Sequence, residues 1–140
     1  MLSHEQKQEI FTKVWNGMKY QGFRLSLGYS RRQVEGPMYR GRNGCKCNIG
    51  HLISDEKYNP RFEGVIVEKI HEDAPYEDVQ RELNEAVGFD SETAEDLQFF
   101  SELQSIHDDA ASDWDIELGL RAFASENGFR LPDGENPSPY

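Results

Sequence analysis

This chain of 140 residues has no long apolar run and only two cysteines, Cys45 and Cys47. No apolar run approaches the ~20 residues that a membrane-spanning helix needs. The first residues, MLSHEQKQEIF, do not show the basic and then apolar pattern of a signal peptide, so we expect a cytoplasmic protein. Cys45 and Cys47 are separated by one residue, and a disulfide that closes so small a loop is strained. We therefore expect two reduced thiols.

Positive charge is scarce in the second half of the chain. Residues 1–67 hold 11 Lys and Arg against 6 Asp and Glu, whereas residues 68–117 hold 2 against 17. The two balances are +5 and −15, and the remaining residues bring the net charge to −11. Direct binding to nucleic acid is not expected at this balance. The sequence also lacks a phosphate-binding glycine loop and a dinucleotide fingerprint.

The apolar pattern predicts one mostly helical domain of the α+β class. Ser3 and Gln6 have the spacing of a helix capping box, and Gly88 and Gly128 follow apolar stripes as helix stops do. A chain of this length buries a core without disulfides. We expect a globular domain over residues 1–131, a disordered Pro-rich tail over 132–140, and about four helices, at residues 4–20, 75–88, 91–107 and 112–127.

The remaining elements are expected to be a small hairpin and short strands. Asn43-Gly44 is a strong signal for a two-residue turn, because both central residues of a type I′ turn need a positive φ. This predicts a hairpin over residues 37–49. Alternation at 23–27 and β-branched residues at 65–67 predict short strands, and residues 30–37 are expected to form a loop.

Two kinds of chemistry are conceivable around the cysteines. Cys45, Cys47 and His51 form a C-x-C-x3-H pattern, and thiolate and imidazole ligands suit zinc. His71 or His107 would supply the fourth ligand, so the zinc hypothesis depends mainly on Cys47, His51 and His107. The pattern lacks the C-x2-C spacing of structural zinc sites, and two buried thiols are the alternative interpretation.

A catalytic interpretation uses Cys47, His107 and Asp108 as a nucleophile, base and orienting acid. Such a set needs the three side chains to be adjacent in space. No known nucleophile signature surrounds Cys47. The alternative for His107 is a residue at the C-terminal end of a helix, where positive charge is favoured. A Cys47-dependent hydrolase is therefore only the third function that we consider.

Residues in two parts of the chain form a recognisable pattern. They are Tyr39-Arg40-Gly41, Lys46-Cys47-x-Ile49-Gly50-x-Leu52-Ile53, Asp55-Glu56-x-Tyr58-x-Pro60 and Glu63-Gly64, with a later Leu103-Gln104-x-Ile106-His107-Asp108. The pattern resembles small uncharacterised proteins encoded by tailed phages and bacterial prophages. The resemblance implies expression from a phage or prophage inside a bacterial cell, and it assigns no catalytic role to any residue. Some similar proteins have Cys at position 51, which favours the ligand interpretation of His51.

The acidic block suggests a surface that binds a basic partner. Clustered carboxylates imitate nucleic acid and speed association with a basic protein. Phage inhibitors of nucleic-acid-handling enzymes often bind in this way, so the resemblance favours a non-enzymatic protein that modulates a host or defence protein. The alternative is a solvated surface that maintains solubility. The candidate contact residues are Glu85, Glu92, Glu95, Asp96, Glu102, Asp108, Asp109 and Asp113.

Basic residues cluster around the expected hairpin and provide a second hypothesis. Guanidinium groups bind phosphate in a bidentate manner. A phosphate or nucleotide site is therefore conceivable within residues 31–51, with His107 nearby. Pairing of these cations with the acidic helices is the alternative. The residues concerned are Arg31, Arg32, Arg40, Arg42 and Lys46.

Overall fold

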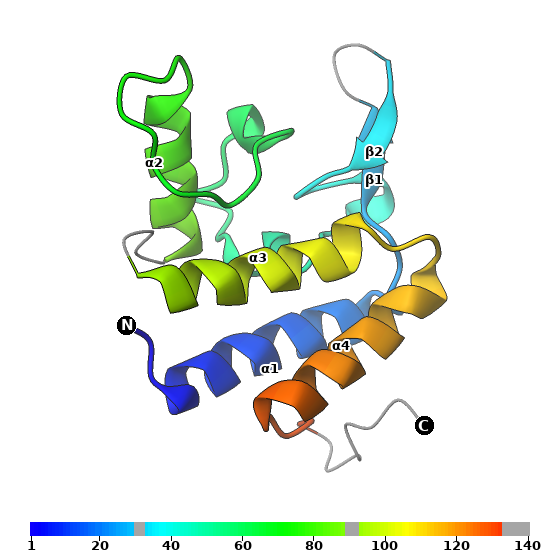
Figure 1. The fold of residues 1–140 in the computed structure, drawn as a ribbon. Coiled ribbons are helices and arrows are strands. Elements are labelled where there is room, and N and C mark those ends of the chain that lie inside the picture. Colours follow the sequence, from blue (N-terminus) through cyan, green and yellow to red (C-terminus); the bar gives the residue numbers. More distant parts are fainter. Residues whose placement is uncertain (30–32, 89–92, 133–140) are drawn as a thin grey trace.

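The computed structural model describes residues 1–29, 33–88 and 93–132. They form four α-helices and a two-stranded antiparallel sheet, the α+β class that the sequence predicts. Three of the helices lie together in one layer, and the fourth helix and the sheet stand above it in the view of Figure 1. The layer contains α1 (His4–Tyr20), α3 (Ala94–Asp108) and α4 (Asp113–Asn127), and above it stand α2 (Glu77–Val87), β1 (Leu27–Tyr29) and β2 (Glu35–Pro37).

The helix ends follow local signals in the sequence. Ser3 Oγ accepts the N–H of Gln6 at 3.1 Å, and the Gln6 side chain accepts the N–H of Ser3 at 2.8 Å, so the capping box is confirmed. Gly88 and Gly128 end α2 and α4 in the left-handed conformation, at φ 93° and 69°. The expected cap of α3, Ser91, lies outside the described residues.

Aromatic side chains form the centre of the helical layer. Phe11 of α1 lies 6.1 Å from Phe123 of α4, and Phe123 lies 5.7 Å from Phe99 of α3, measured between ring centres. Phe129, just after α4, stacks on Phe11 at 5.5 Å. Trp114 of α4 does not join this core and is 68% exposed. It lies about 200° around the helix from the inward-facing Ile116 and therefore points away.

The regular sheet lies before the expected hairpin, and its first strand begins at Leu27, where the strand expected at 23–27 was predicted to end. Its strands pair Leu27 with Pro37 and Tyr29 with Glu35, so β2 occupies part of the expected loop at 30–37. The expected hairpin at 37–49 keeps its turn, with Asn43 at φ 60°, but only one isolated bridge closes it, between Arg40 and Lys46. The backbone N–H groups of Tyr39 and Arg40 instead donate to the Glu63 side chain.

The expected strand at 65–67 is also missing from the described residues, because side chains satisfy its backbone. The Val67 N–H donates to Gln104 Oε1 at 2.8 Å, and the Val65 carbonyl accepts the hydroxyl of Tyr39. The expected tail, 132–140, lies outside the described residues except for Pro132. Within those residues, no helix has both the length and the apolar character needed to cross a membrane.

Candidate functional site

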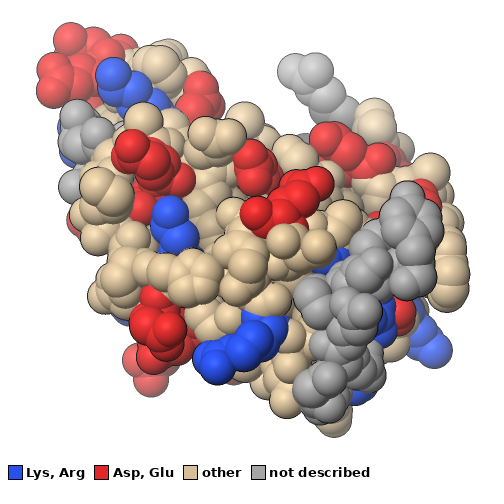
Figure 2. All heavy atoms as spheres, turned by 60° about the horizontal axis from the view of Figure 1, so that its bottom comes forward, with Lys and Arg blue, Asp and Glu red and all other residues tan. Residues whose placement is uncertain are grey.

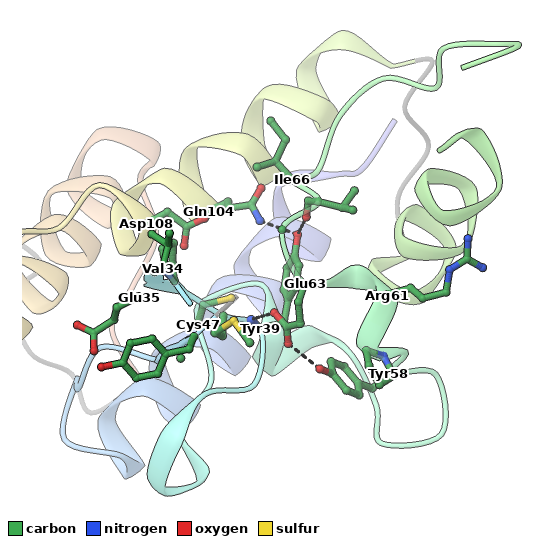
Figure 3. Close-up of a pocket in the computed structure, with 18 residues that line it drawn as sticks. Val34, Glu35, Tyr39, Cys47, Tyr58, Arg61, Glu63, Ile66, Gln104 and Asp108 are labelled. Carbon is green, nitrogen blue, oxygen red and sulfur yellow. Dashed lines mark hydrogen bonds between the residues drawn. The ribbon is translucent and has the colours of Figure 1, made fainter. Parts of the chain in front are cut away.

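A pocket of about 900 Å³ lies between the sheet and residues 58–66 (Figure 3). Residues 28–29 and 34–38 line one side, and residues around Tyr58, Glu63 and Ile66 line the other. Tyr39, Cys47 and Gln104 are almost completely buried and form the floor. The pocket therefore has one wall that belongs to a sheet and one wall without regular strand structure.

Glu63 joins the two walls. Its Oε1 accepts the N–H of Tyr39 at 2.8 Å, and its Oε2 accepts the N–H of Arg40 at 3.2 Å and the hydroxyl of Tyr58 at 2.6 Å. Hydrogen bonds to a charged acceptor are stronger than those between neutral groups. The carboxylate thus holds the segment after β2 against residues 58–63. In the sequence, Glu63 was recognised only as part of the phage-like pattern, because no local signal in the sequence indicates these contacts.

Gln104 of α3 holds the other end of the irregular wall. Its Nε2 donates to the Tyr39 hydroxyl oxygen at 2.7 Å, while its Oε1 accepts the Val67 N–H. The Tyr39 hydroxyl in turn donates to the Val65 carbonyl. Burial, followed by the nearby Cys47, raises the pKa of Tyr39, so the hydroxyl keeps the proton that it donates. The pocket floor is therefore built from satisfied polar groups.

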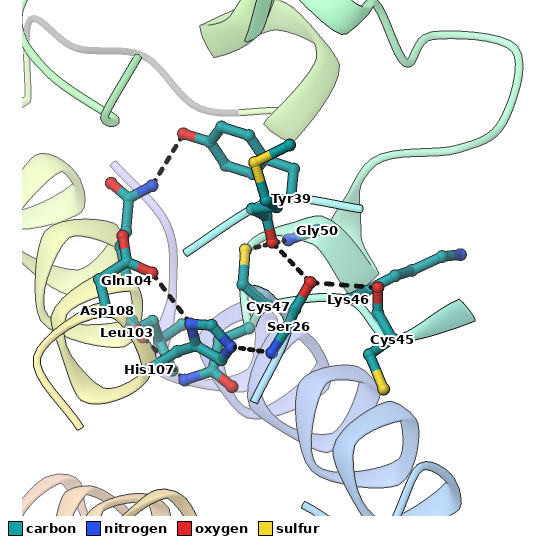
Figure 4. Close-up of polar contacts among 12 residues, drawn as sticks. Ser26, Tyr39, Cys45, Lys46, Cys47, Gly50, Leu103, Gln104, His107 and Asp108 are labelled. Atoms are coloured by element: carbon teal, nitrogen blue, oxygen red, sulfur yellow. Dashed lines mark hydrogen bonds and ion pairs between the residues drawn. The ribbon is translucent and has the colours of Figure 1, made fainter. Parts of the chain in front are cut away.

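His107 anchors the beginning of the sheet to the end of α3 (Figure 4). The N–H of Ser26 donates to His107 Nε2 at 2.8 Å, so this nitrogen carries no proton. The proton therefore lies on Nδ1, which is 3.0 Å from Asp108 Oδ1 and donates to it. His107 is completely buried and uses both ring nitrogens in these contacts.

The Cys47 thiol does not have an activated environment. Its sulfur accepts the N–H of Gly50 at 3.3 Å, and burial, followed by the charge of Asp108, raises its pKa. His107 holds its only ring proton toward Asp108 and its lone pair toward Ser26, and neither nitrogen bonds to the thiol. Cys47 and Asp108 both line the pocket, but the arrangement stabilises a protonated thiol.

The residues of the zinc hypothesis do not form a ligand set. His51 Nε2 lies 3.0 Å from Gln21 Oε1, and burial lowers the pKa of His51 to about 4. His107 uses both ring nitrogens, and His71 lies on the surface, 3.2 Å from Glu68. In residues 1–29, 33–88 and 93–132, no group of three or more His, Cys, Asp or Glu side chains could hold a metal ion. Both cysteines are buried free thiols.

The acidic residues predicted to bind a partner have different environments. On the face shown in Figure 2, Asp and Glu form several separate groups, with Lys and Arg between some of them. Glu92 lies outside the described residues. Asp108 is partly buried in the pocket. The exposed members are Glu85, Glu95, Glu102, Asp109 and Asp113.

Asp96 was predicted to lie on an exposed surface, and this is corrected by the structure. Its side chain is buried, and both carboxylate oxygens lie 3.1 Å from the N–H of Leu2. The ammonium group of Met1 is 3.9 Å away. Asp113 is exposed but also has a structural contact, since it accepts the N–H of Leu25 at 2.7 Å. In both cases the carboxylate accepts a hydrogen bond from a backbone N–H that is distant in the sequence.

Two basic residues of the phosphate hypothesis, Arg40 and Arg42, are paired with acidic side chains. Arg40 Nη2 lies 2.8 Å from Asp55 Oδ1 and donates to the Ile53 carbonyl at 3.2 Å. Arg42 pairs with Glu35. Lys46 lies opposite Arg40 in the isolated bridge, and Arg31 and Arg32 lie outside the described residues. The acids in these pairs, Asp55 and Glu35, lie in the same part of the chain and not on the acidic helices, so the described contacts of Arg40 and Arg42 differ from the expected pairing with those helices.

The pocket gathers residues from both parts of the motif recognised in the sequence. Tyr39, Tyr58 and Glu63 come from the first part, and Gln104 and Asp108 come from the second. No family model, no curated protein and no solved structure matches this chain.

Proposed function

We propose that the chain is a non-enzymatic binding protein of phage or prophage origin that modulates a host or defence protein. The partner binds in the pocket between the sheet and residues 58–66. The supporting observation is the apolar rim of the pocket: Tyr29, Val34 and Ile66 are 59%, 62% and 55% exposed. Exposed apolar side chains gathered around a concavity are typical of a binding site.

The rim of the pocket gathers exposed apolar side chains that are scarce elsewhere on the described surface. Seven large apolar or aromatic side chains are exposed among the described residues, and three of them line this one pocket. Below them, the contacts of Glu63 and Gln104 fix both walls before any partner arrives. A preformed site loses less conformational entropy on binding, and this favours affinity.

The acidic surface supports the same proposal through long-range attraction. Glu85, Glu95, Glu102 and Asp109 are exposed on α2, on α3 and just after it. Residues 68–117 carry a balance of −15. A field of one sign raises the association rate with a partner of the opposite sign. In this proposal the partner has a basic surface, and the pocket supplies the short-range apolar contacts.

Affinity capture from a bacterial host lysate tests the proposal with two matched substitutions. Ile66→Glu and Trp114→Glu each place a carboxylate on an exposed apolar residue, but only Ile66 lines the pocket. We expect a partner that is retained by the wild type and Trp114→Glu and lost by Ile66→Glu. Both variants should keep the wild-type melting temperature, since exposed substitutions change stability by only about 0.5 kcal/mol.

Two results would contradict the proposal. The first is a partner that Ile66→Glu captures as well as the wild type does. The second is capture that does not weaken as salt rises, because attraction between exposed charges is screened over ~10 Å at 0.1 M salt.

A further inference from the structure

We infer that the pocket receives a lysine or arginine side chain of the partner, with Asp108 binding the charged end and apolar rim residues covering the stem. The inference rests on the proposed function and specifies the chemistry of its partner. It depends on three observations: the unused oxygen of Asp108, the charge of the lining residues and the position of Asp108 at a helix end.

Asp108 has one oxygen available inside the pocket. Its side chain is 22% exposed, and Oδ1 accepts the Nδ1–H of His107. Within the described part of the chain, Oδ2 has no hydrogen-bond or ion-pair partner. Since Ser26 keeps Nε2 of His107 unprotonated, the histidine is neutral and does not cancel the carboxylate charge. A carboxylate that accepts one hydrogen bond has further lone pairs for a cation.

The charge of the lining residues favours a cation as the occupant. Glu35, Glu63 and Asp108 line the pocket. Glu35 is paired with Arg42 and Glu63 accepts three hydrogen bonds, so Asp108 is the lining carboxylate with an unused oxygen. Arg61 is the one cationic side chain among the described lining residues. Arg61 is already 3.3 Å from Asp78, outside the pocket. In Figure 3, Asp108, Val34 and Glu35 are seen on the opposite side of the pocket from Arg61. An acidic ligand would meet repulsion at the Asp108 end.

The position of Asp108 in the fold adds to this preference. It is the last residue of α3, and the C-terminal end of a helix favours positive charge. Apolar side chains line the same pocket, among them the exposed Val34 and Ile66 and also Met38. Lysine and arginine have an apolar stem and a charged end, and they bury the stem along such surfaces. The pocket is complementary to both parts.

Selection of displayed random peptides on the immobilised full-length protein tests the inference. We expect enriched peptides to contain Lys or Arg beside apolar residues. Synthetic copies should bind Asp108→Asn about tenfold or more weakly than the wild type, because a hydrogen bond between charged groups is lost. The amide oxygen of the asparagine can still accept from His107, so the melting temperature should stay near that of the wild type.

Asp109→Asn is the matched control. It removes the same charge from the next residue, which is exposed and does not line the pocket. Peptide affinity for this variant should stay within about twofold of the wild type, as expected for an exposed charge. A similar loss in both variants would show a general charge effect and would overturn the inference.

Other outcomes separate the inference from the proposed function. Apolar or acidic peptides that bind Asp108→Asn normally but fail to bind Ile66→Glu would overturn the inference and leave the binding pocket supported. Peptides that bind Ile66→Glu normally would place the binding surface elsewhere and contradict both. If no peptide is enriched and N-acetyl-lysine methylamide leaves the amide NMR signals of Cys47 and Asp108 unshifted, the inference is also overturned.

Discussion

The helical layer and the pocket-bearing segment 33–68 are stabilised by different interactions. In the helical layer, aromatic rings from α1, α3 and α4 meet with 5.7 to 6.1 Å between their centres. In segment 33–68, the regular structure is β2 and three single-turn 3₁₀ helices. Here the side chains of Glu63 and Gln104 satisfy backbone N–H groups that would otherwise need a neighbouring strand.

The difference shows how this small fold keeps a pocket open. Apolar packing closes the space between helices, because close packing of side chains leaves few voids. A pocket wall held in place by a few directed hydrogen bonds is stable without side chains packed against it on the pocket side. Segment 33–68 also contributes buried side chains such as Ile49 and Phe62 to the core, but its pocket wall is held by the hydrogen bonds of Glu63 and Gln104. Four predictions test this division.

The largest effect is expected in the helical layer, from Phe11→Ala. Phe11 is completely buried and contacts the rings of Trp15, Phe123 and Phe129. Replacing a buried Phe by Ala typically lowers the free energy of unfolding by about 3–5 kcal/mol. Urea denaturation would measure the loss. Tyr20→Ala on the same helix is the control, since Tyr20 is 96% exposed and should change stability by less than about 0.5 kcal/mol.

A smaller but still large effect is expected where the helical layer contains a buried charge. Asp96→Lys removes the acceptor of the Leu2 N–H and buries a cation, so we expect a loss of about 2–4 kcal/mol. Glu95→Lys reverses a charge on the neighbouring exposed residue and should change stability by less than about 0.5 kcal/mol. Equal melting temperatures for the two variants would contradict the structural role of Asp96.

In segment 33–68, Glu63→Gln should have a local effect. The amide retains one acceptor oxygen for three donors and brings an N–H₂ group toward them, at a cost of about 1–3 kcal/mol. Hydrogen exchange should become faster at the amides of Tyr39 and Arg40 and remain unchanged in α1. Glu56→Gln, at an exposed residue, is the control. Equally faster hydrogen exchange in segment 33–68 and in α1 would show that the segment and the helical layer do not open separately.

The smallest effect concerns the pH dependence of stability at His51. This residue of segment 33–68 contacts Gln21, at the end of α1 in the helical layer. Burial lowers the pKa of His51 from 6.5 to about 4, so the unfolded chain binds its proton more readily than the folded chain does. The contribution of His51 to stability is therefore complete above pH 6.5 and is lost as the pH falls toward 4. His51→Gln should flatten the stability profile between pH about 6.5 and 5, before most carboxylates titrate. An unchanged slope would contradict a neutral buried His51.

The helices could be predicted well from the sequence, and the pocket could not. The capping box at Ser3 and the glycine stops at Gly88 and Gly128 act within a few residues, so their effect is readable from the local pattern. The contacts that build the pocket are not local. Glu63 is 24 residues from Tyr39, and Gln104 is 65 residues from it. No periodicity links such pairs.

The same reasoning explains the errors at individual residues. Glu95 and Asp96 are adjacent acids on a helix, yet one is exposed and the other accepts the N–H of Leu2, 94 residues away. The Asn43-Gly44 turn forms as predicted, but the arms of its hairpin do not, because Glu63 takes the N–H groups of Tyr39 and Arg40. A distant side chain thus overrides a correct local signal.

The sequence by itself determined the α+β class, the presence of four helices, the cap of α1 at Ser3, the glycine stops of α2 and α4, and the acidic balance of residues 68–117. These properties depend on composition and on neighbours within a few residues of one another. Only the tertiary structure decided that Glu63, Gln104 and Asp108 surround one pocket with an apolar rim. The reason is physical: buried carboxylates and amides bind whichever donors the packing of the helices brings to them, and that packing is a property of the whole chain.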